Sequence, residues 1–568
     1  MSEPTPFDVL VLGGGLAGLT LALQIHRQRP GTRIAVVDKA EWPPPVAAHK
    51  VGESTVELGT YYLRQVLGLA DYLDAQQLPK LGLRFFFDPA QADDIARRLE
   101  MGASGKLPVP SHQLDRGLFE VELARRVRDA GIEHLTGWRV SGVQLDKAGH
   151  TTTIKRAPDT RTLGSRWVVD ATGRAATLKR NLGLLAPIEH HASAVWFRLG
   201  TEIDVADWSD DPAWSARVPA GMRRLSTNHL MGRGYWVWLI PLASGSTSIG
   251  IVTDDREHDL KAMSTFEGAL RWLAEHEPQA ARIIGGHADL LQDFLVLRRY
   301  SHHAERMFSS ARWALTGDAG AFLDPFYSPG TDFIALANTY ATDLIVRELD
   351  GEKIRSRANE YSRTFLQMVD AWLPVYQNMY RVFGHTQILA LKVAWDFCTY
   401  WSFQVLMFVN RGFTDVALMT KTRGLWQRIT ELNAALQKNL LFWASVEPTP
   451  ELDGRGGFVD PMSITFLRDF HVGMVDVLAP DALAERLAAN LARLELISAE
   501  INRRAACRLY GLAPDTPLDP YVFSLQDLAG GTPPAGPTPV GSDAAVVQDI
   551  DRCWFAGDAR GALTVSPR

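Results

Sequence analysis

The sequence predicts an α/β fold followed by a mostly helical C-terminal region, and two observations carry this prediction. In residues 7–349, short apolar runs rich in Val and Ile alternate with helical patterns and glycine-marked turns. This alternation is typical of a largely parallel sheet with helices on its faces, interleaved with a second sheet. From about residue 353 to residue 526, apolar residues instead recur at helical spacing, as they do in residues 481–504.

The length of 568 residues exceeds that of one usual domain. We expect a first domain over residues 1–349 and a helical domain over residues 350–528. Residues 529–542 are rich in Pro and Gly and cannot form a helix or a central strand. Residues 529–568 are therefore predicted to be a linker or tail.

The first apolar run, residues 7–12, leads directly into Gly13-Gly14-Gly15-Leu16-Ala17-Gly18. A strand, a glycine-rich turn and a helix in this order are typical of a Rossmann-type dinucleotide-binding domain. Gly13 permits the tight turn, and Gly15 lets the backbone approach a pyrophosphate. Gly18 lets the helix pack closely on the strand, so that the phosphates meet the positive end of the helix.

An acidic residue is expected about 20 residues after such a turn, where it can bind the two hydroxyls of a ribose. The second apolar strand, residues 33–38, ends in Asp38 and meets this expectation. The candidate nucleotide contacts in this part of the chain are Gly13, Gly15, Leu16, Ala17, Gly18, Asp38 and Lys39.

Two later strands also end in glycine-containing loops. Residues 166–170 run into Asp170-Ala171-Thr172-Gly173, a second loop expected close to the nucleotide. Residues 313–316 run into Gly317-Asp318, which places a carboxylate where it can bond a polyol. Three glycine-marked strand ends in this order resemble the FAD-dependent monooxygenase superfamily, in which the last Asp binds the ribityl chain. The resemblance implies FAD as the cofactor and Asp170, Gly173 and Asp318 as candidate contacts.

Gln113 and Arg116 resemble the Gln/Arg contact to the cofactor in the same superfamily. The alternative is that they mark an exposed helix start with a solvated arginine.

Three further segments resemble one branch of that superfamily, the flavin-dependent halogenases. Residues 51–56, Val-Gly-Glu-Ser-Thr-Val, match the segment that covers the flavin and contain Glu53 and Ser54. Residues 236–241, Trp-Val-Trp-Leu-Ile-Pro, match the Trp-x-Trp-x-Ile-Pro signature. Residues 78–85 match the Lys-x-Gly-x-x-Phe strand that carries the catalytic lysine, here Lys80. The resemblance covers roughly the first 345 residues.

This resemblance implies a defined chemistry. In the family, reduced flavin arrives from a separate NAD(P)H-dependent flavin reductase and reacts with O₂ and then with chloride or bromide to give hypohalous acid. Lys80 would hold this acid beside the substrate, as a hydrogen-bond donor or as a haloamine. The apolar strand after Lys80 predicts a partly desolvated amine, and desolvation lowers the pKa of an amine. The alternative is a surface lysine that begins a strand.

Trp236 and Trp238 are two residues apart on one predicted strand, so both side chains point to the same side. Large side chains there are expected to keep the substrate from meeting the flavin directly. The alternative is that both indoles belong to the core of the sheet.

A long helix is expected over residues 332–349, and in the family its N-terminus faces the flavin and can hold an anion. Gly330 and Thr331 are therefore the candidate halide-binding residues. Tyr327 stands where tryptophan halogenases have a glutamate, which argues for a phenolic or pyrrolic ring over free tryptophan. Pro329 replaces a residue whose N–H helps to bind chloride, and proline has no N–H to donate.

Composition excludes other classes of function. The formal net charge of −6 and the lack of basic stripes argue against binding to nucleic acid. The three cysteines have no metal-ligand spacing, so we expect no metal site. We expect neither a signal peptide nor a transmembrane segment, which predicts a cytoplasmic location. Residues 388–409 are apolar and aromatic but interrupted by charge, which favours a buried core helix over an aromatic substrate wall or a membrane-surface face.

The sequence leaves two other functions open. An FAD-dependent monooxygenase or dehydrogenase acting on an apolar substrate would keep the nucleotide motifs and need neither halide nor Lys80 and the paired tryptophans. The other function is that of a flavoprotein whose helical region serves mainly to bind a carrier protein or a membrane. A carrier-tethered substrate would also require such a docking surface on a halogenase.

Overall fold

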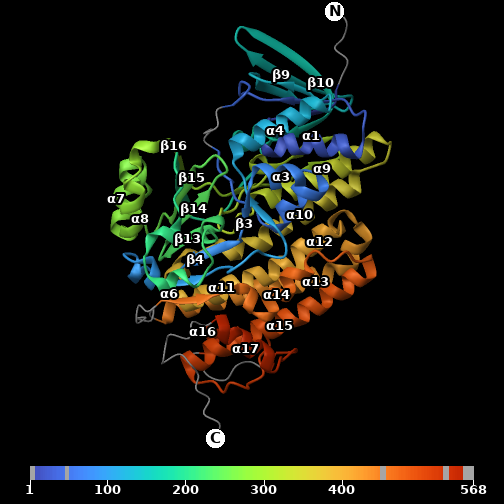
Figure 1. The fold of residues 1–568 in the computed structure, drawn as a ribbon. Coiled ribbons are helices and arrows are strands. Elements are labelled where there is room, and N and C mark those ends of the chain that lie inside the picture. The colour runs from blue at the N-terminus through green and yellow to red at the C-terminus, as the bar shows by residue number, and fades with distance from the viewer. Residues whose placement is uncertain (1–6, 45–49, 448–455, 529–535, 554–568) are drawn as a thin grey trace, which may run out of the picture. The chain divides into compact units, whose positions relative to one another are not determined.

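A computed structural model describes residues 7–44, 50–447, 456–528 and 536–553. The chain forms two compact units that interleave along the sequence. Unit 1 comprises residues 1–78, 114–189 and 300–372, and unit 2 comprises residues 79–113, 190–299 and 373–568. This division differs from the consecutive domains that we expected at 1–349, 350–528 and 529–568, because the chain passes repeatedly between two sheets and the helical region contributes to both units (Figure 1). The start of the expected tail, residues 529–535, lies outside the described residues, as do residues 554–568.

The central sheet of unit 1 has the strand order β18-β19-β10-β1-β2-β7, in which β10 is also joined to a β8–β9 ladder. The strands are β1 (Phe7–Leu12), β2 (Ile34–Val37), β7 (Glu133–Leu135), β8 (Arg139–Gln144), β9 (His150–Arg156), β10 (Asp159–Asp170), β18 (Phe308–Ser309) and β19 (Trp313–Leu315). Strands β2, β1, β10 and β19 are parallel, and Leu12 lies level with both Val37 and Asp170. Their carboxyl ends therefore meet at one edge of the sheet, which brings the three glycine-marked loops together.

The helices of unit 1 are α1 (Leu16–Gln28), α2 (Glu57–Tyr61), α3 (Ala70–Gln76), α4 (Arg116–Asp129), α5 (Thr177–Asn181), α9 (Gly330–Leu349) and most of α10 (Arg355–Tyr376). Helix α9 begins at Gly330, two residues before the predicted start. Pro329 at the N-cap has helical dihedral angles, so the backbone turns into the helix at this residue.

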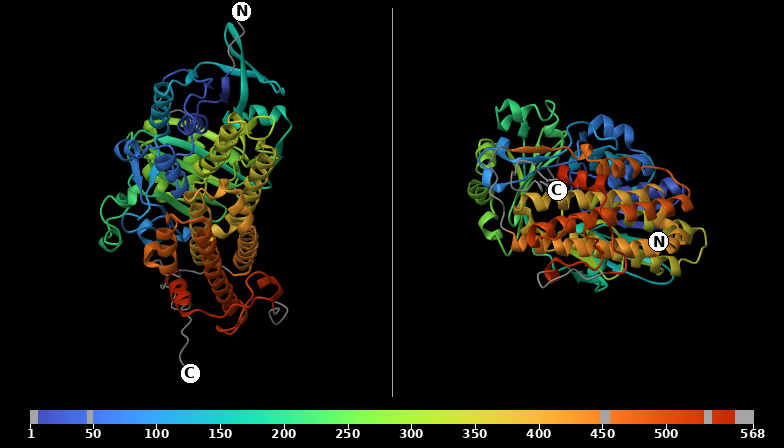
Figure 2. Two further views of the ribbon diagram at one scale, coloured as in Figure 1. Left: turned by 90° about the vertical axis from the view of Figure 1, so that its right-hand side faces the viewer. Right: turned by 90° about the horizontal axis from the view of Figure 1, so that it is seen from below.

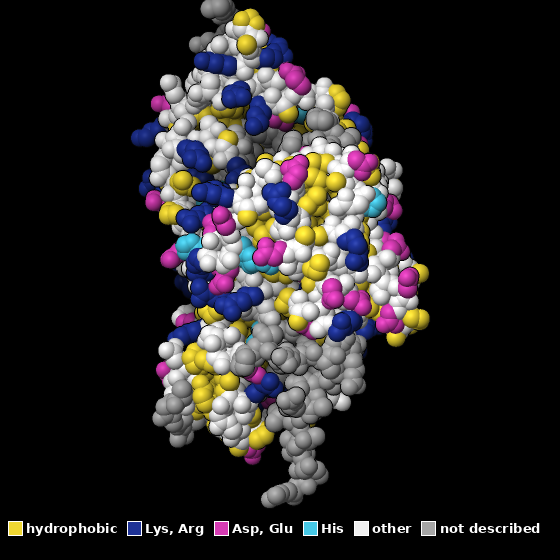
Figure 3. All heavy atoms as spheres, turned by 90° about the vertical axis from the view of Figure 1, so that its left-hand side faces the viewer, with side chains coloured by type: hydrophobic (Ala, Val, Ile, Leu, Met, Phe, Trp, Pro, Cys, Tyr) yellow, Lys and Arg dark blue, Asp and Glu magenta, His cyan; other side chains and the backbone are white. Residues whose placement is uncertain are grey.

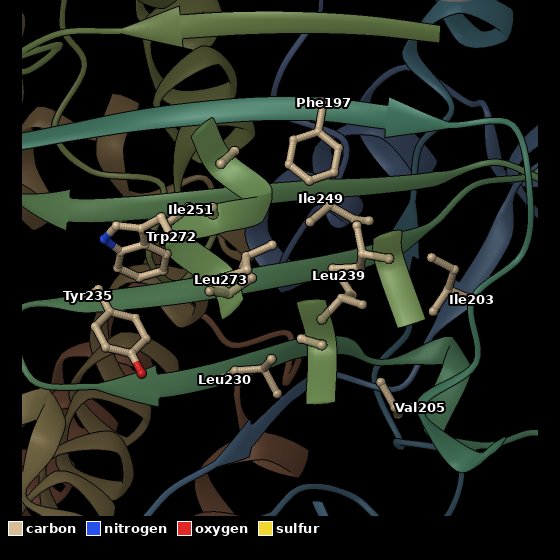
Figure 4. Packing of buried hydrophobic residues seen from close by; sticks show 14 of the residues in the cluster. Phe197, Ile203, Val205, Leu230, Tyr235, Leu239, Ile249, Ile251, Trp272 and Leu273 are labelled. Carbon is tan, nitrogen blue, oxygen red and sulfur yellow. The ribbon is translucent and has the colours of Figure 1, made fainter. Parts of the chain in front are cut away.

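The main sheet of unit 2 has the order β16-β12-β15-β14-β13-β4-β5-β20. Its strands are β4 (Leu83–Phe86), β5 (Leu99–Met101), β12 (Ala192–Leu199), β13 (Thr227–Gly232), β14 (Tyr235–Pro241), β15 (Thr247–Asp254), β16 (Leu291–Leu297) and β20 (Gly457–Val459). One face carries Leu230, Tyr235 and Leu239, which pack against Trp272 and Leu273 of helix α7 (Phe266–His276) (Figure 4). Because side chains alternate along a strand, the neighbouring residues belong to the opposite face.

The C-terminal part of unit 2 is helical, as predicted. It contains α11 (Thr386–Thr399), a π-helical turn (Tyr400–Val405), α12 (Leu406–Val409), α13 (Val416–Val446), α14 (Thr465–Gly473), α15 (Pro480–Tyr510) and α17 (Ala544–Cys553). Helices α13 and α15 run side by side (Figure 2). The apolar stretch at 388–409 is almost entirely buried, which confirms the prediction of a core segment. Its Lys392 is also buried and donates to Asp396 at 2.5 Å, so the charges that interrupt the stretch neutralise each other.

Basic and acidic side chains both occur on the face drawn in Figure 3, in keeping with the small net charge. Among the described residues, no helix is both long enough and apolar enough to cross a bilayer.

Candidate functional site

The glycine turn after β1 has the geometry that a bound pyrophosphate requires. Gly13 has a φ of +113°, and a Cβ there would stand 2.2 Å from the Ala171 carbonyl oxygen. A Cβ on Gly18 would stand 1.9 Å from the Gly13 carbonyl oxygen, so α1 packs closely on the strand. A Cβ on Gly15 would meet nothing within 4 Å. The tight turn, the open approach and the close packing are therefore found at the three glycines predicted to provide them.

Asp38 follows β2 and lies directly beside this turn. A Cβ on Gly14 would stand 2.5 Å from an Asp38 carboxylate oxygen, while the other oxygen accepts the Ala40 N–H at 3.1 Å. The half-buried carboxylate is thus held at the edge of the turn, where ribose hydroxyls could donate to it. Binding of the nucleotide by Asp38 and Lys39 stays a prediction.

Asp170 shapes the second loop through its buried carboxylate. One oxygen accepts the N–H and the hydroxyl of Thr172 at 2.9 and 2.6 Å, and the other accepts the Leu178 N–H at 2.7 Å. Gly173 takes a left-handed conformation, with a φ of +60°. Asp170 therefore fixes the path of this loop, and contacts of Asp170 and Gly173 with the cofactor stay predictions.

Asp318, Arg116 and Glu53 form a charged group in unit 1. Burial raises the pKa of the Asp318 carboxyl, and the positive charge of Arg116 opposes this effect. Burial lowers the pKa of Arg116 to about 10, while Asp318 and Glu53 raise it. The Arg116 side chain is 12% exposed and donates to the Val51 carbonyl at 2.8 Å, so it is not a solvated arginine.

Two further candidates differ in their placement. Ser54 is buried in unit 1, where the Glu53 carbonyl before it accepts the Leu114 N–H at 2.5 Å. Gln113 belongs to unit 2, where its side-chain amide donates to the Thr227 hydroxyl at 2.9 Å.

The structure adds a residue that sequence reasoning missed, Asn338 in α9. Its side-chain amide donates to the Ala17 carbonyl at 3.1 Å and to the Tyr62 hydroxyl at 3.0 Å, and its oxygen accepts the Thr316 hydroxyl at 2.6 Å. A Cβ on Gly317 would stand 2.9 Å from the Ala17 Cβ. Asn338 therefore ties the first glycine turn to the loop that carries Asp318. A lone amide among the apolar residues of α9 is the signal that could have revealed it.

The first turn of α9 contains both predicted halide-binding residues. Thr331 is buried against Gly59, on which a Cβ would stand 2.8 Å from the Thr331 Cβ. Asp332 accepts the Gly59 N–H at 2.8 Å, which fixes α2 against this turn. The N–H groups of a first helical turn have no acceptor within the helix and carry partial positive charge. Halide binding at Gly330 and Thr331 stays a prediction, and it has to overcome the nearby Asp332 carboxylate.

Lys80 is the last residue of β3 (Leu78–Lys80) in unit 2, and it is 2% exposed. It is therefore buried more completely than the partial desolvation that we expected, and it is not a surface lysine. The neighbouring His229 was not singled out in the sequence. Burial and the Lys80 charge lower the pKa of His229 to about 3, so its imidazole is neutral near pH 7. The ring stacks on Phe85 with centroids 4.8 Å apart, and its Nδ1 lies 3.1 Å from the Arg84 carbonyl.

Trp236 and Trp238 point to the same side of β14, as predicted, with ring centroids 5.6 Å apart. Both are buried on the face opposite the cluster drawn in Figure 4. Nε1 of Trp238 donates to the Ser248 hydroxyl at 3.3 Å. A Cβ on Gly250 in the next strand would stand 2.2 Å from the Trp238 ring, so this indole requires a glycine beside it. The burial of both indoles is compatible with a barrier between substrate and flavin and with a place in the core of the sheet. The barrier role stays a prediction.

Comparison with known proteins adds independent evidence. Residues 6–258 match the family model of the FAD binding domain. The chain is 24% identical over 441 residues to the flavin-dependent halogenase chlA of Dictyostelium discoideum, covering 71% of each chain. It is 25% identical over 367 residues to a Pseudoalteromonas luteoviolacea brominase named for 1H-pyrrole-2-carbonyl groups on a peptidyl-carrier protein, covering 62% of this chain and 80% of that one.

The fold is also that of a solved halogenase. The structure of halogenase PltM in complex with phloroglucinol and FAD superposes with a TM-score of 0.59 at 16% identity, covering 86% of this chain and 96% of that chain. The FAD binding domain, the halogenase relatives and the shared fold agree with the geometry of unit 1. The cofactor is therefore FAD, bound by a chain that carries an FAD binding domain over residues 6–258, and the proteins that it resembles in sequence and in fold are flavin-dependent halogenases, which are FAD-dependent enzymes.

Proposed function

We propose that the protein halogenates an electron-rich aromatic ring, using reduced FAD, O₂ and a halide ion. The observation that carries the proposal is Lys80, a buried amine beside a layer of aromatic rings in a chain with an FAD-binding unit. Reactive amines occupy buried, water-poor sites of this kind in enzymes.

The residues of unit 1 fit FAD. In this proposal, the pyrophosphate occupies the open space at Gly15, Asp38 accepts hydrogen bonds from a ribose, and Asp318 accepts hydrogen bonds from the ribityl hydroxyls. When bound in its reduced form, FAD would supply two electrons to O₂ and the halide would supply two more, so that each O₂ yields one hypohalous acid and one water. A separate NAD(P)H-dependent flavin reductase would provide the reduced cofactor.

Lys80 then determines where the oxidised halogen is used. Its amine holds hypohalous acid by a hydrogen bond, or forms a haloamine with loss of water and returns to the free amine when the ring takes the halogen. The dry, aromatic surroundings protect the reagent from water and other nucleophiles. In this proposal, Trp236 and Trp238 keep the organic substrate away from the flavin, and Gly330 and Thr331 hold the halide with their backbone N–H groups.

We further propose a phenolic or pyrrolic ring as the substrate. Tyr327 provides no carboxylate to assist Lys80, so the ring itself has to be electron-rich. Two relatives support this class, since one carries a phenol in its structure and the other is named for a pyrrole on a carrier protein. The substrates to be tested should therefore include pyrroles both as free compounds and attached to a carrier protein.

The test combines the full chain with a flavin reductase, NADH, FAD and either bromide or chloride, and follows a panel of phenols and pyrroles by mass spectrometry. Halogenated product that requires halide and the added reductase supports the proposal. Pro329 favours one competing outcome, because it removes an N–H from the halide site. Hydroxylated product, or NAD(P)H oxidation by this chain without a reductase, would establish a halide-independent monooxygenase instead.

A further inference from the structure

Another buried lysine, Lys179, lies in unit 1, and none of the FAD motifs includes it. It stands in the short helix α5, directly after the Asp170 loop, and its side chain is fully buried. Its Nζ donates to the Gly320 carbonyl at 3.0 Å and lies 3.3 Å from Nδ1 of His302. A buried ammonium with two defined acceptors fixes the groups around it.

Both acceptors are joined to the segment around Asp318 by backbone hydrogen bonds. The Gly320 N–H donates to the Gly317 carbonyl at 2.8 Å and closes the turn that holds Asp318. His302 is fixed by reciprocal backbone hydrogen bonds of 2.8 Å with Phe322. Lys179 therefore connects the loop after β10 to the loop after β19, which are two of the three loops expected to surround the cofactor.

The charges around Lys179 come from four elements. Asp170 at the end of β10 and Asp318 after β19 both raise its pKa, whereas Arg180 in α5 lowers it. Burial has the largest effect, and the pKa of Lys179 falls to about 8. Burial and Lys179 lower the pKa of His302 to about 4, with smaller contributions from Arg174 and Arg180. Near pH 7, a charged amine thus faces a neutral imidazole whose Nδ1 accepts its hydrogen bond.

We propose that Lys179 is a positioning residue for FAD, whose ammonium holds the Gly317–Gly320 turn so that Asp318 meets the ribityl chain. This inference rests on the proposed contact between Asp318 and FAD, and it makes cofactor affinity depend on pH. When Lys179 loses its proton, the attraction to Asp170 and Asp318 ends and the turn is held less firmly. FAD affinity is therefore constant below about pH 8 and falls above it.

The test measures the Kd of the full-length apoprotein for FAD by fluorescence titration at several pH values between 6.5 and 9.5. Lys179→Met is expected to bind FAD about tenfold more weakly at pH 7. Its Kd should also lack the step near pH 8, which is the rise in Kd that the wild type shows when Lys179 loses its proton. Lys179→Arg keeps a charge throughout this range, so it should restore part of the affinity and also lack the step. A merely structural role would not move this pH profile.

Two matched lysines serve as controls. Lys155 is exposed on β9 of the same unit, so Lys155→Met should behave as the wild type. Burial also lowers the pKa of Lys50 in unit 1 to about 8. The step should therefore survive in Lys50→Met if Lys179 causes it.

Three results would overturn the inference: wild-type affinity in Lys179→Met at pH 7, a step that persists in that variant, or a wild-type Kd that does not change across pH 8. If Lys179→Met does not fold, the wild-type profile and Lys179→Arg still decide. No halide, reductase or aromatic substrate enters the measurement, so its failure is distinct from a failure of the proposed halogenase activity.

Discussion

Trp236 donates a hydrogen bond from Nε1 to the hydroxyl of Tyr380 over 3.0 Å. Both side chains are buried, and Tyr380 lies in a 3₁₀ turn (Met379–Gly384) that precedes α11. A residue of the helical region thus orients the first indole of the Trp-x-Trp signature, which the strand alone would leave free to rotate about its side-chain bonds.

Replacing Tyr380 by Phe should therefore destabilise unit 2. The change removes the acceptor and leaves the buried indole N–H without it, which costs about 1–2 kcal/mol. Urea unfolding should show a lower midpoint for Tyr380→Phe than for the control Tyr510→Phe, at a partly exposed position. Equal midpoints would mean that the hydrogen bond does not hold the indole.

Replacing Lys80 by Met should abolish halogenation while FAD binding is retained, because the methionine keeps the volume and loses the amine. We expect halogenated product to fall by at least about a hundredfold. Mass spectrometry of the products and an FAD titration measure the two effects. Lys106→Met, at an exposed position in unit 2, is the matched control. Halogenation that survives in Lys80→Met would assign the delivery of the halogen to another group.

Substitutions at two glycines of the first turn should have different effects, one on FAD affinity and the other on the free energy of unfolding. Gly15→Ser puts its Cβ into open space at the N-cap of α1, so the free energy of unfolding of the apoprotein should stay within about 0.5 kcal/mol of the wild-type value. FAD affinity should nevertheless fall about tenfold, because the side chain occupies the expected place of the phosphates.

Gly18→Ala should instead destabilise the apoprotein by about 2 kcal/mol, since its Cβ collides with the Gly13 carbonyl. Chemical unfolding of both apoproteins, followed by FAD titration, separates the two effects. Equal stabilities of the two variants would contradict the close packing of α1 on β1.

His229 should make the protein less stable in mild acid. Its folded pKa of about 3 lies below the ordinary value of 6.5, so the unfolded chain binds a proton first as the pH falls. The stability that the neutral ring provides is complete above about pH 6.5 and is lost progressively toward pH 3. Between pH 7 and pH 5 the loss should be about 2 kcal/mol.

His229→Asn removes this titration, so its unfolding free energy should change less between pH 7 and pH 5 than that of the wild type. The partly exposed His287 supplies the control, His287→Asn. An unchanged pH dependence in His229→Asn would show that His229 is not the group responsible.

The sequence predicts the parts of the site that depend on local structure. The turn at Gly13, the strand ends at Asp38 and Asp170 and the shared side of Trp236 and Trp238 follow from motif spacing and strand alternation. The interleaving with a second sheet was also expected, but the points at which the chain passes from one sheet to the other could not be predicted, because such a passage leaves no local mark in the sequence.

The residues that the sequence missed act across long separations. Asn338, Lys179 and His229 are unremarkable in their own helices or strands, and their roles appear only in contacts with other elements.

The contact between Gly250 and Trp238 makes these two positions an epistatic pair. A bulkier residue at position 250 has no room while the indole is present, so it becomes tolerable only after the tryptophan has been made smaller. Directed evolution for larger substrates should therefore randomise both positions in one library. Single substitutions would miss the combinations in which a smaller residue at 238 makes room for a larger one at 250.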